Sequence, residues 1–312
     1  MTGSTHQPLI FDIRHLALDD GPGLRTTVFF KGCPLSCAWC HNPESMESRQ
    51  EVAFYAHLCL GCGECQSVCP VGAIRLDRND RIDRQICTGC GTCAHECPTR
   101  ALQVIGRHYP LPEFLAICEG DSLFHETSQG GVTLSGGEPT LFMDYGESLA
   151  IGLKKQNTHL ALQTCGLFEM RDFKEKLLPY LDLIFYDLKI FDPGEHRKYT
   201  GRRNERILQN FLELRKISSA KVIPRVPLIP GITATPENLT AIAGFLKKAG
   251  CSTCILLPYN PAGSGKRRAL GKPVAPDIPD RMMRAEEEGG WRSLFDEVLN
   301  TPPPPSGRTD PP

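Results

Sequence analysis

The chain has 312 residues, a formal net charge of -1 and 40% hydrophobic residues. This length exceeds the ~100–200 residues of one domain, so we expect one large α/β domain with an insert, or two domains. The small net charge excludes electrostatic attraction to nucleic acid or an anionic membrane, and no apolar run approaches the ~18 residues of a transmembrane helix. Fifteen cysteines without a secretory pattern predict a cytoplasmic protein that binds metal rather than forming disulfides.

The first predicted elements are two strands that lead into a cysteine-rich loop. The first strand covers residues 11–18 and is followed by a turn at 20–23; the second, β-branched and aromatic, covers 26–30. The loop has the pattern Cys33-x₃-Cys37-x₂-Cys40. Structural zinc sites and electron-transfer clusters use four protein ligands, so three thiolates on a four-iron cube leave one iron open. A three-cysteine zinc knuckle completed by His41 is the alternative.

Residues 59–98 contain an internal repeat of the bacterial ferredoxin pattern C-x₂-C-x₂-C-x₃-C-P. The two runs are Cys59, Cys62, Cys65 and Cys69, then Cys87, Cys90, Cys93 and Cys97. In two-cluster ferredoxins the fourth cysteine of each run binds the other cluster, so Cys97 would complete the first set and Cys69 the second. We predict a ferredoxin-like 2×[4Fe-4S] insert at 53–105; two four-cysteine zinc ribbons are the alternative.

After residue 105 an alternating α/β pattern resumes. It predicts helices at 111–128, 145–156, 170–178, 204–217, 235–249 and 281–300, and strands at 131–135, 159–164, 181–186, 221–231 and 253–257. Residues 192–201 and 261–275 are expected to be loops, and 301–312 a disordered Pro-rich tail. Roughly six βα units are too few for a closed eight-stranded barrel. We therefore predict an open or partial barrel made of residues 1–52 and 106–300.

Polar motifs follow two of these strands, at the edge where α/β folds bind ligands. Gly136-Gly137-Glu138-Pro139 follows the strand at 131–135; glycines allow close backbone approach to a ligand, and Glu138 adds a carboxylate. Asp187 and Lys189 follow the strand at 181–186, and alternate strand positions share one face. A simple strand-to-helix turn and a surface ion pair are the respective alternatives.

The ordered segments DGPGLRTTVFFKGCPLSCAWCHNPES, SGGEPT, LQTCG, FYDLKIFD-x₃-HRKYTG, PRVPLIPGI and LLPYN resemble one enzyme family. That family comprises the glycyl radical enzyme activating enzymes of the radical S-adenosylmethionine (SAM) superfamily. The resemblance is to the branch with a two-cluster ferredoxin-like insert. The resemblance covers residues 9–260. It implies a partial (β/α)6 radical-SAM barrel, three [4Fe-4S] clusters and bound SAM. The implied reaction is hydrogen abstraction by a 5′-deoxyadenosyl radical from one glycine of a partner enzyme.

The resemblance also implies roles for individual residues. The catalytic cluster would be bound by Cys33, Cys37 and Cys40. Glu138 and the two glycines before it would hold the SAM amino group, and Arg225 the SAM carboxylate. The full cofactor-binding set would be Trp39, Cys40, His41, Gly136, Gly137, Glu138, Thr164, Asp187, Leu188, Lys189, Arg225 and Asn260. The partner's glycine loop would be met by Asp20, Gly21, Pro22, Gly23 and Arg25.

Two positions depart from the formate-lyase activators: Asn260 stands where those have histidine, and Gln163 where those have aspartate. A role for an imidazole, or a cation site built on that carboxylate, is therefore not carried over. The implied partners are a glycyl radical enzyme and a flavodoxin or ferredoxin-type reductant, with the chain itself monomeric. The alternatives are a radical SAM enzyme acting directly on a small molecule or peptide, and a ferredoxin-type electron carrier without catalysis.

Overall fold

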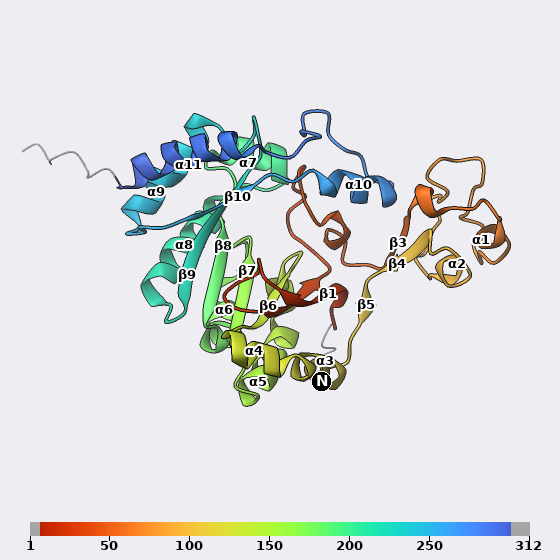
Figure 1. The fold of residues 1–312 in the computed structure, drawn as a ribbon, viewed down its shortest axis with the longest axis horizontal. Helices are drawn as coiled ribbons and strands as arrows, with labels where there is room; N and C mark the ends of the chain where they lie inside the picture. Colours follow the sequence, from red (N-terminus) through yellow and green to blue (C-terminus); the bar gives the residue numbers. More distant parts are fainter. Residues whose placement is uncertain (1–6, 301–312) are drawn as a thin grey trace, which may run out of the picture.

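The computed structural model describes residues 7–300, which form a large curved sheet covered by helices, with a smaller cysteine-rich region to one side (Figure 1). The sheet order is β10-β9-β8-β7-β6-β2-β1-β5. Within the described residues, its six parallel strands are β2 (Arg25–Phe30), β6 (Gly131–Gly136), β7 (Leu160–Thr164), β8 (Leu183–Asp187), β9 (Lys221–Leu228) and β10 (Ile255–Pro258). Antiparallel β1 (Leu9–Ala17) and β5 (Arg107–His108) extend one edge. The predicted partial (β/α)6 barrel is confirmed.

Helices connect consecutive parallel strands and cover the outer face of the sheet. They are α3 (Leu111–Gly120), α4 (Ser122–Ser128), α5 (Met143–Lys155), α6 (Met170–Lys176), α8 (Glu205–Ile217) and α9 (Pro236–Lys248), with α11 (Ala285–Asn300) packed on α9. α8 shows why they pack there: Ile207, Phe211 and Leu214 recur at helical spacing and are all buried. Within residues 7–300, every helix is too short or too polar to cross a bilayer.

The parallel strands bury both faces, as their continuous apolar runs require. In β8, Ile184 and Tyr186 belong to the main core, and Tyr186 packs edge-on against Phe211 of α8. The alternate residues Leu183 and Phe185 form a separate small cluster on the opposite, inner face. The inner face at the carboxyl ends of the strands is therefore where a site can form.

Residues 51–105 form the cysteine-rich region at the far side of the molecule (Figure 1). β3 (Glu51–Phe54) pairs antiparallel with β4 (Leu102–Ile105), and the single-turn helices α1 (Glu64–Ser67) and α2 (Thr92–His95) each lie within one cysteine run and contain its third cysteine. Gly63 and Gly91 precede these helices with left-handed backbone, at φ 84 and φ 82. The sequence repeat is thus also a structural repeat.

Two segments predicted as loops are helices, α7 (Pro193–Thr200) and α10 (Ala262–Ala269). α7 starts at an N-cap, because Asp192 Oδ1 accepts hydrogen bonds from the amides of Gly194 and Glu195, and Pro193 occupies the first helical position. α10 forms despite Gly263 and Gly265, which lower helix propensity. Short 3₁₀ helices are η1 (Pro43–Ser45), η2 (Ala56–Leu58), η3 (Pro139–Phe142) and η4 (Leu178–Tyr180). The predicted tail at 301–312 lies outside the described residues.

Candidate active site and iron–sulfur centres

The loop after β2 lies directly against the turn after β6. The amide of Gly137 donates to Phe30 O at 2.8 Å, and the amide of Glu138 donates to Gly32 O at 2.8 Å. A Cβ on Gly137 would lie 2.0 Å from Gly32 O. Gly136 has φ +104, and a Cβ on it would lie 2.3 Å from Phe30 N. Both glycines are therefore required for this close backbone approach, which brings the Gly-Gly-Glu-Pro turn to the cysteine loop.

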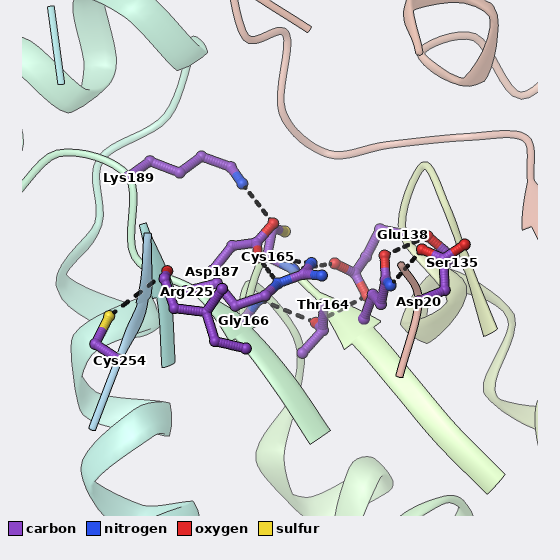
Figure 2. A network of polar contacts seen from close by, with 12 residues as sticks. Asp20, Ser135, Glu138, Thr164, Cys165, Gly166, Asp187, Lys189, Arg225 and Cys254 are labelled. Carbon is purple, nitrogen blue, oxygen red and sulfur yellow. Dashed lines mark hydrogen bonds and ion pairs between the residues drawn. The ribbon is translucent and has the colours of Figure 1, made fainter. Parts of the chain in front are cut away.

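The Glu138 carboxylate is completely buried and bonded within the protein. Its Oε1 accepts hydrogen bonds from the hydroxyls of Thr140 (2.8 Å) and Thr164 (2.9 Å), and its Oε2 from the amide of Cys165 at 2.7 Å (Figure 2). These bonds tie the turn after β6 to the end of β7. The carboxylate thus fixes the turn from within, and the role of Gly136, Gly137 and Glu138 in holding the SAM amino group stays a prediction.

Asp187 and Lys189 meet Arg225 at the ends of β8 and β9, as Figure 2 shows. Asp187 Oδ2 lies 3.0 Å from Lys189 Nζ, and Asp187 Oδ1 lies 2.8 Å from Arg225 Nη2. Burial raises the pKa of the Asp187 carboxyl, but the charges of Arg225 and Lys189 outweigh it and hold that pKa below its usual range. Burial lowers the pKa of Lys189, but Asp187 and then the Cys37 thiol outweigh it and raise that pKa. Two cations share one carboxylate, so the group suits an anionic ligand.

The thiols of Cys33, Cys37 and Cys40 lie together beside these charges. Burial, and then the charge of Cys37, raises the pKa of Cys33 well above its ordinary value. Burial raises the pKa of Cys37 to about 12, and the amide of Cys40 donates to Cys37 O at 3.1 Å. Within residues 7–300, no three His, Cys, Asp or Glu side chains converge closely enough to bind a single metal ion. The three thiols interact electrostatically with one another, and burial raises the pKa of each.

α7 supports one side of the cysteine loop. The amide of Ser36 donates to Thr200 O at 2.8 Å, and that of Ala38 to Tyr199 O at 2.9 Å. Trp39 is buried in the main core with its ring 6.2 Å from that of Tyr199. The structure therefore places Trp39, predicted to line the adenine side, in the packing that supports the loop. The HRKYTG motif, residues 196–201, therefore supports the cysteine loop.

α10 supports the other side, and the sequence interpretation missed it. Arg267 Nη2 donates to Cys37 O at 2.5 Å, and a Cβ on Gly263 would lie 2.2 Å from Cys40 O. Asn260, predicted to bind cofactor, is exposed and accepts a hydrogen bond from the amide of Ala262 at the start of α10. That contact ties Asn260 to the turn that leads into α10, and its cofactor-binding role stays a prediction. The only sequence signal for this contact was the basic run 266–268.

The Asp20–Gly23 turn is hydrogen-bonded to side chains of strands β6 and β7. Gln163 Nε2 donates to Asp20 Oδ1 at 2.8 Å, and the Thr133 hydroxyl donates to Asp20 O at 2.9 Å. Arg25 is completely buried and donates to Thr133 Oγ1 at 2.5 Å and to Val132 O at 2.6 Å, and burial lowers its pKa to about 10. Arg25 was predicted to contact the partner; the structure corrects this, because its guanidinium holds the turn from below.

A half-open cavity of about 420 Å³ adjoins this turn. Its lining residues include Gly21, Pro22, Leu183, Phe185, Ile223 and Arg225. Arg225 thus borders both the cavity and the Lys189–Asp187 pair. The cavity leads along the inner face of the sheet towards the ends of β8 and β9.

The two cysteine runs interlock. Cys59, Cys62, Cys65 and Cys97 line one small, largely enclosed cavity, so the fourth cysteine of the second run joins the first three. Burial and the neighbouring thiols of Cys87 and Cys69 raise the pKa of Cys93 to about 11. Cys69 therefore lies with the second set. These observations agree with the crossed arrangement that the repeat predicts.

This fold and these thiols define a class: a partial-barrel protein with a three-cysteine loop after its first parallel strand and a cysteine-rich insert. Residues 84–246 match the radical SAM superfamily, residues 58–101 a 4Fe-4S dicluster domain, and residues 19–67 a 4Fe-4S single cluster domain. The fold is also similar to that of a radical SAM methyltransferase from Sphaerobacter thermophilus, with a TM-score of 0.51 at 14% identity over 94% of this chain and 75% of that chain.

Curated relatives narrow the class. The chain is 42% identical to the benzylsuccinate synthase activating enzyme of Thauera aromatica, over 85% of this chain and 82% of that protein. It is 39% identical to the trans-4-hydroxy-L-proline dehydratase activating enzyme of Clostridioides difficile, over 83% and 86%. It is 38% identical to the choline trimethylamine-lyase activating enzyme of Oleidesulfovibrio alaskensis, over 84% and 87%.

The chain belongs to the glycyl radical enzyme activating enzymes of the radical SAM superfamily. It uses iron–sulfur clusters and S-adenosylmethionine, and it cleaves SAM reductively to make a radical that acts on a glycyl radical enzyme.

Proposed function

We propose that the chain holds three [4Fe-4S] clusters and that the one bound by Cys33, Cys37 and Cys40 performs the SAM cleavage. One observation carries this assignment: the three thiols lie together, bonded into a loop beside the cationic Lys189–Asp187–Arg225 group. The other two clusters would use Cys59, Cys62, Cys65 and Cys97, and Cys87, Cys90, Cys93 and Cys69. The enclosed cavity lined by the first of these sets supports a cluster of that composition.

SAM bound at the open iron supplies the 5′-deoxyadenosyl radical once an electron arrives. The protein's own residues orient it. Lys189 and Arg225 supply positive charge for the SAM carboxylate, and Asp187 fixes both side chains by ion pairs. The backbone at Gly136 and Gly137 faces the cysteine loop through the contacts with Phe30 and Gly32 and is the group we assign to the SAM amine. His41, Thr164 and Leu188 complete this proposed lining.

The partner's glycine loop would enter the cavity beside the Asp20–Gly23 turn. That cavity is lined by the turn itself and by apolar side chains of the inner face, among them Leu183, Phe185 and Ile223. A radical intermediate needs a water-poor chamber, so we propose that the entering glycine loop closes this half-open cavity. Asp20, fixed by Gln163, presents its backbone turn to this chamber. We assign the recognition of the glycine loop to residues 20–23.

The remaining assignments concern the insert and its reductant. We propose that residues 53–105 form a separate ferredoxin-like domain inserted into the barrel residues 1–52 and 106–300, and that a flavodoxin or ferredoxin delivers electrons to it. All fifteen cysteines are free thiols in the structure, which supports a cytoplasmic, reducing location.

The decisive experiment measures 5′-deoxyadenosine formed by the anaerobically reconstituted full chain with SAM and dithionite. Cys37→Ala should abolish product while leaving ~8 irons bound in the two ferredoxin-type clusters. Cys251→Ala, a partly buried thiol outside all three sets, is the matched control and should retain product and iron. Product from Cys37→Ala at the wild-type rate contradicts the assignment of the catalytic cluster.

A further inference from the structure

α10 is the element that joins the cysteine loop to the insert. Figure 1 shows it between the barrel and residues 51–105. Ala269 and Leu270 pack against Ala53, and Arg84 Nη2 of the insert donates to Ala269 O at 3.1 Å. The same helix contacts the loop through Arg267. Its position is thus fixed at both ends, by the insert and by the loop.

The Arg267 guanidinium is buried against the cysteine loop without a carboxylate of its own. It is 8% exposed, and its Nη2 contacts Cys37 O at 2.5 Å and Met46 Sδ at 3.9 Å. Among the described residues, its Nε has no hydrogen-bond partner. A buried cation that is hydrogen-bonded only to a carbonyl is costly, so a nearby negative centre is the expected compensation.

Glu44 is the opposite charge on the same loop. It is 7% exposed; its Oε1 lies 3.0 Å from Lys266 Nζ, and within residues 7–300 its Oε2 has no hydrogen-bond partner. Both Arg267 and Glu44 act electrostatically on the thiol of Cys40, with opposite signs. A cation and an anion are therefore held close to one cluster ligand.

We propose that Arg267 is a positioning residue of the catalytic cluster: it holds the Cys37 carbonyl, and its charge raises the reduction potential of that cluster, while Glu44 lowers it. Reduction adds one negative charge to the cluster, and a buried cation stabilises that charge because the interior screens it weakly. Potentials of iron–sulfur clusters respond to such charges and hydrogen bonds. This inference rests on the proposed assignment of the cluster to Cys33, Cys37 and Cys40.

The test is a redox titration of the reconstituted full chain, followed by electron paramagnetic resonance. Only the signal that changes on adding SAM is integrated, because that change identifies the cluster with an open iron among the three. Arg267→Gln should lower the midpoint by about 59 mV, so that the ratio of reduced to oxidised cluster at a fixed potential falls about tenfold for this one-electron couple. Glu44→Gln should shift the midpoint in the opposite direction.

Two further variants separate charge from structure. Arg268→Gln removes the same charge from an exposed neighbour on α10 and should leave the midpoint unchanged. Arg267→Lys keeps the charge and should return the midpoint most of the way to the wild-type value. A purely structural role would lower iron retention in both Arg267→Gln and Glu44→Gln without opposite shifts, and that result overturns the proposal.

The outcome also distinguishes this inference from the assignment beneath it. If the wild-type chain shows no SAM-responsive signal, the cluster assignment itself is wrong. If the signal is present and Arg267→Gln has the wild-type midpoint, the assignment stands and the role of Arg267 is refuted.

Discussion

The barrel and the insert are held together by different means. The barrel has one continuous core of aromatic and aliphatic side chains, including Phe114, Phe173 and Phe211, all completely buried. The insert has a small core around Val52, Phe54, Ile74 and Ile82, with its cluster cysteines packed against it. It leaves Leu60 77% exposed and Ile86 43% exposed. Small regions that cannot bury enough apolar surface depend on metal or disulfides, so the insert should depend on iron where the barrel does not.

Iron removal should have the largest effect on the structure, and it should unfold the insert while the barrel stays folded. Because ligand binding and folding are coupled in small metal domains, chelation under reducing conditions should expose the tryptic sites Arg75, Arg78, Arg81 and Arg84. The barrel should keep its far-UV circular dichroism. Time-resolved trypsin digestion measures this. Equal protection of residues 75–84 with and without iron would refute the contrast between the two regions.

Phe211→Ala should have the converse effect. This ring is completely buried and packs against Tyr186 and Phe245, so its removal should cost about 4 kcal/mol of unfolding free energy. Urea unfolding of the barrel, followed by circular dichroism, measures the loss. The ~8 irons of the two ferredoxin-type clusters should remain bound in the native variant. Iron loss in proportion to barrel destabilisation would mean that the two regions unfold as one unit.

Gly137→Ala should disturb the junction between the turn after β6 and the cysteine loop. Its Cβ would lie 2.0 Å from Gly32 O, and forcing such a contact costs about 1–3 kcal/mol. Gly244→Ala is the control, since it lies in helix α9 with open space around the added atom, and it should stabilise the barrel by about 1 kcal/mol. Urea unfolding midpoints of the two variants should therefore move in opposite directions.

Cys97→Ala tests the crossed cysteine sets within the insert. Since Cys97 lines the cavity of the first set, the variant should lose a cluster's worth of iron, ~4 atoms, at the position of Cys59, Cys62 and Cys65. Iron content together with the spectrum of the remaining ferredoxin-type cluster measures this. Iron loss restricted to the cluster of Cys87, Cys90 and Cys93 would show that the sets are not crossed.

Arg225→Gln should have the smallest effect and should change only the affinity for SAM. The variant removes one of the two cations that share Asp187, so the pKa of Asp187 should rise towards its ordinary value. Loss of one charge-assisted contact should weaken SAM binding about tenfold, or about 1.4 kcal/mol. Equilibrium SAM binding measures it, and Arg225→Lys should recover part of the affinity. Unchanged SAM affinity would remove Arg225 from the proposed carboxylate site.

The contribution of the sequence differs between parts of the molecule. Cysteine spacing predicted the insert and its crossed sets, because a cluster of given size restricts ligand spacing to a few residues. Short continuous apolar runs predicted the six parallel strands, because each strand has to be buried on both faces. The N-cap at Asp192 was a readable signal for α7 that the Gly and Pro content of the segment obscured.

The sequence by itself determined the family and the parallel strands of the barrel, and it predicted the ligand sets from the spacing of the cysteines. Only the tertiary structure decided what individual polar side chains do. Glu138 accepts hydrogen bonds from Thr140, Thr164 and the amide of Cys165, and Arg25, predicted to contact the partner, is completely buried. Arg267 reaches the cysteine loop from 230 residues away. A buried polar group must take the partners that the fold brings to it, and those partners are distant in sequence.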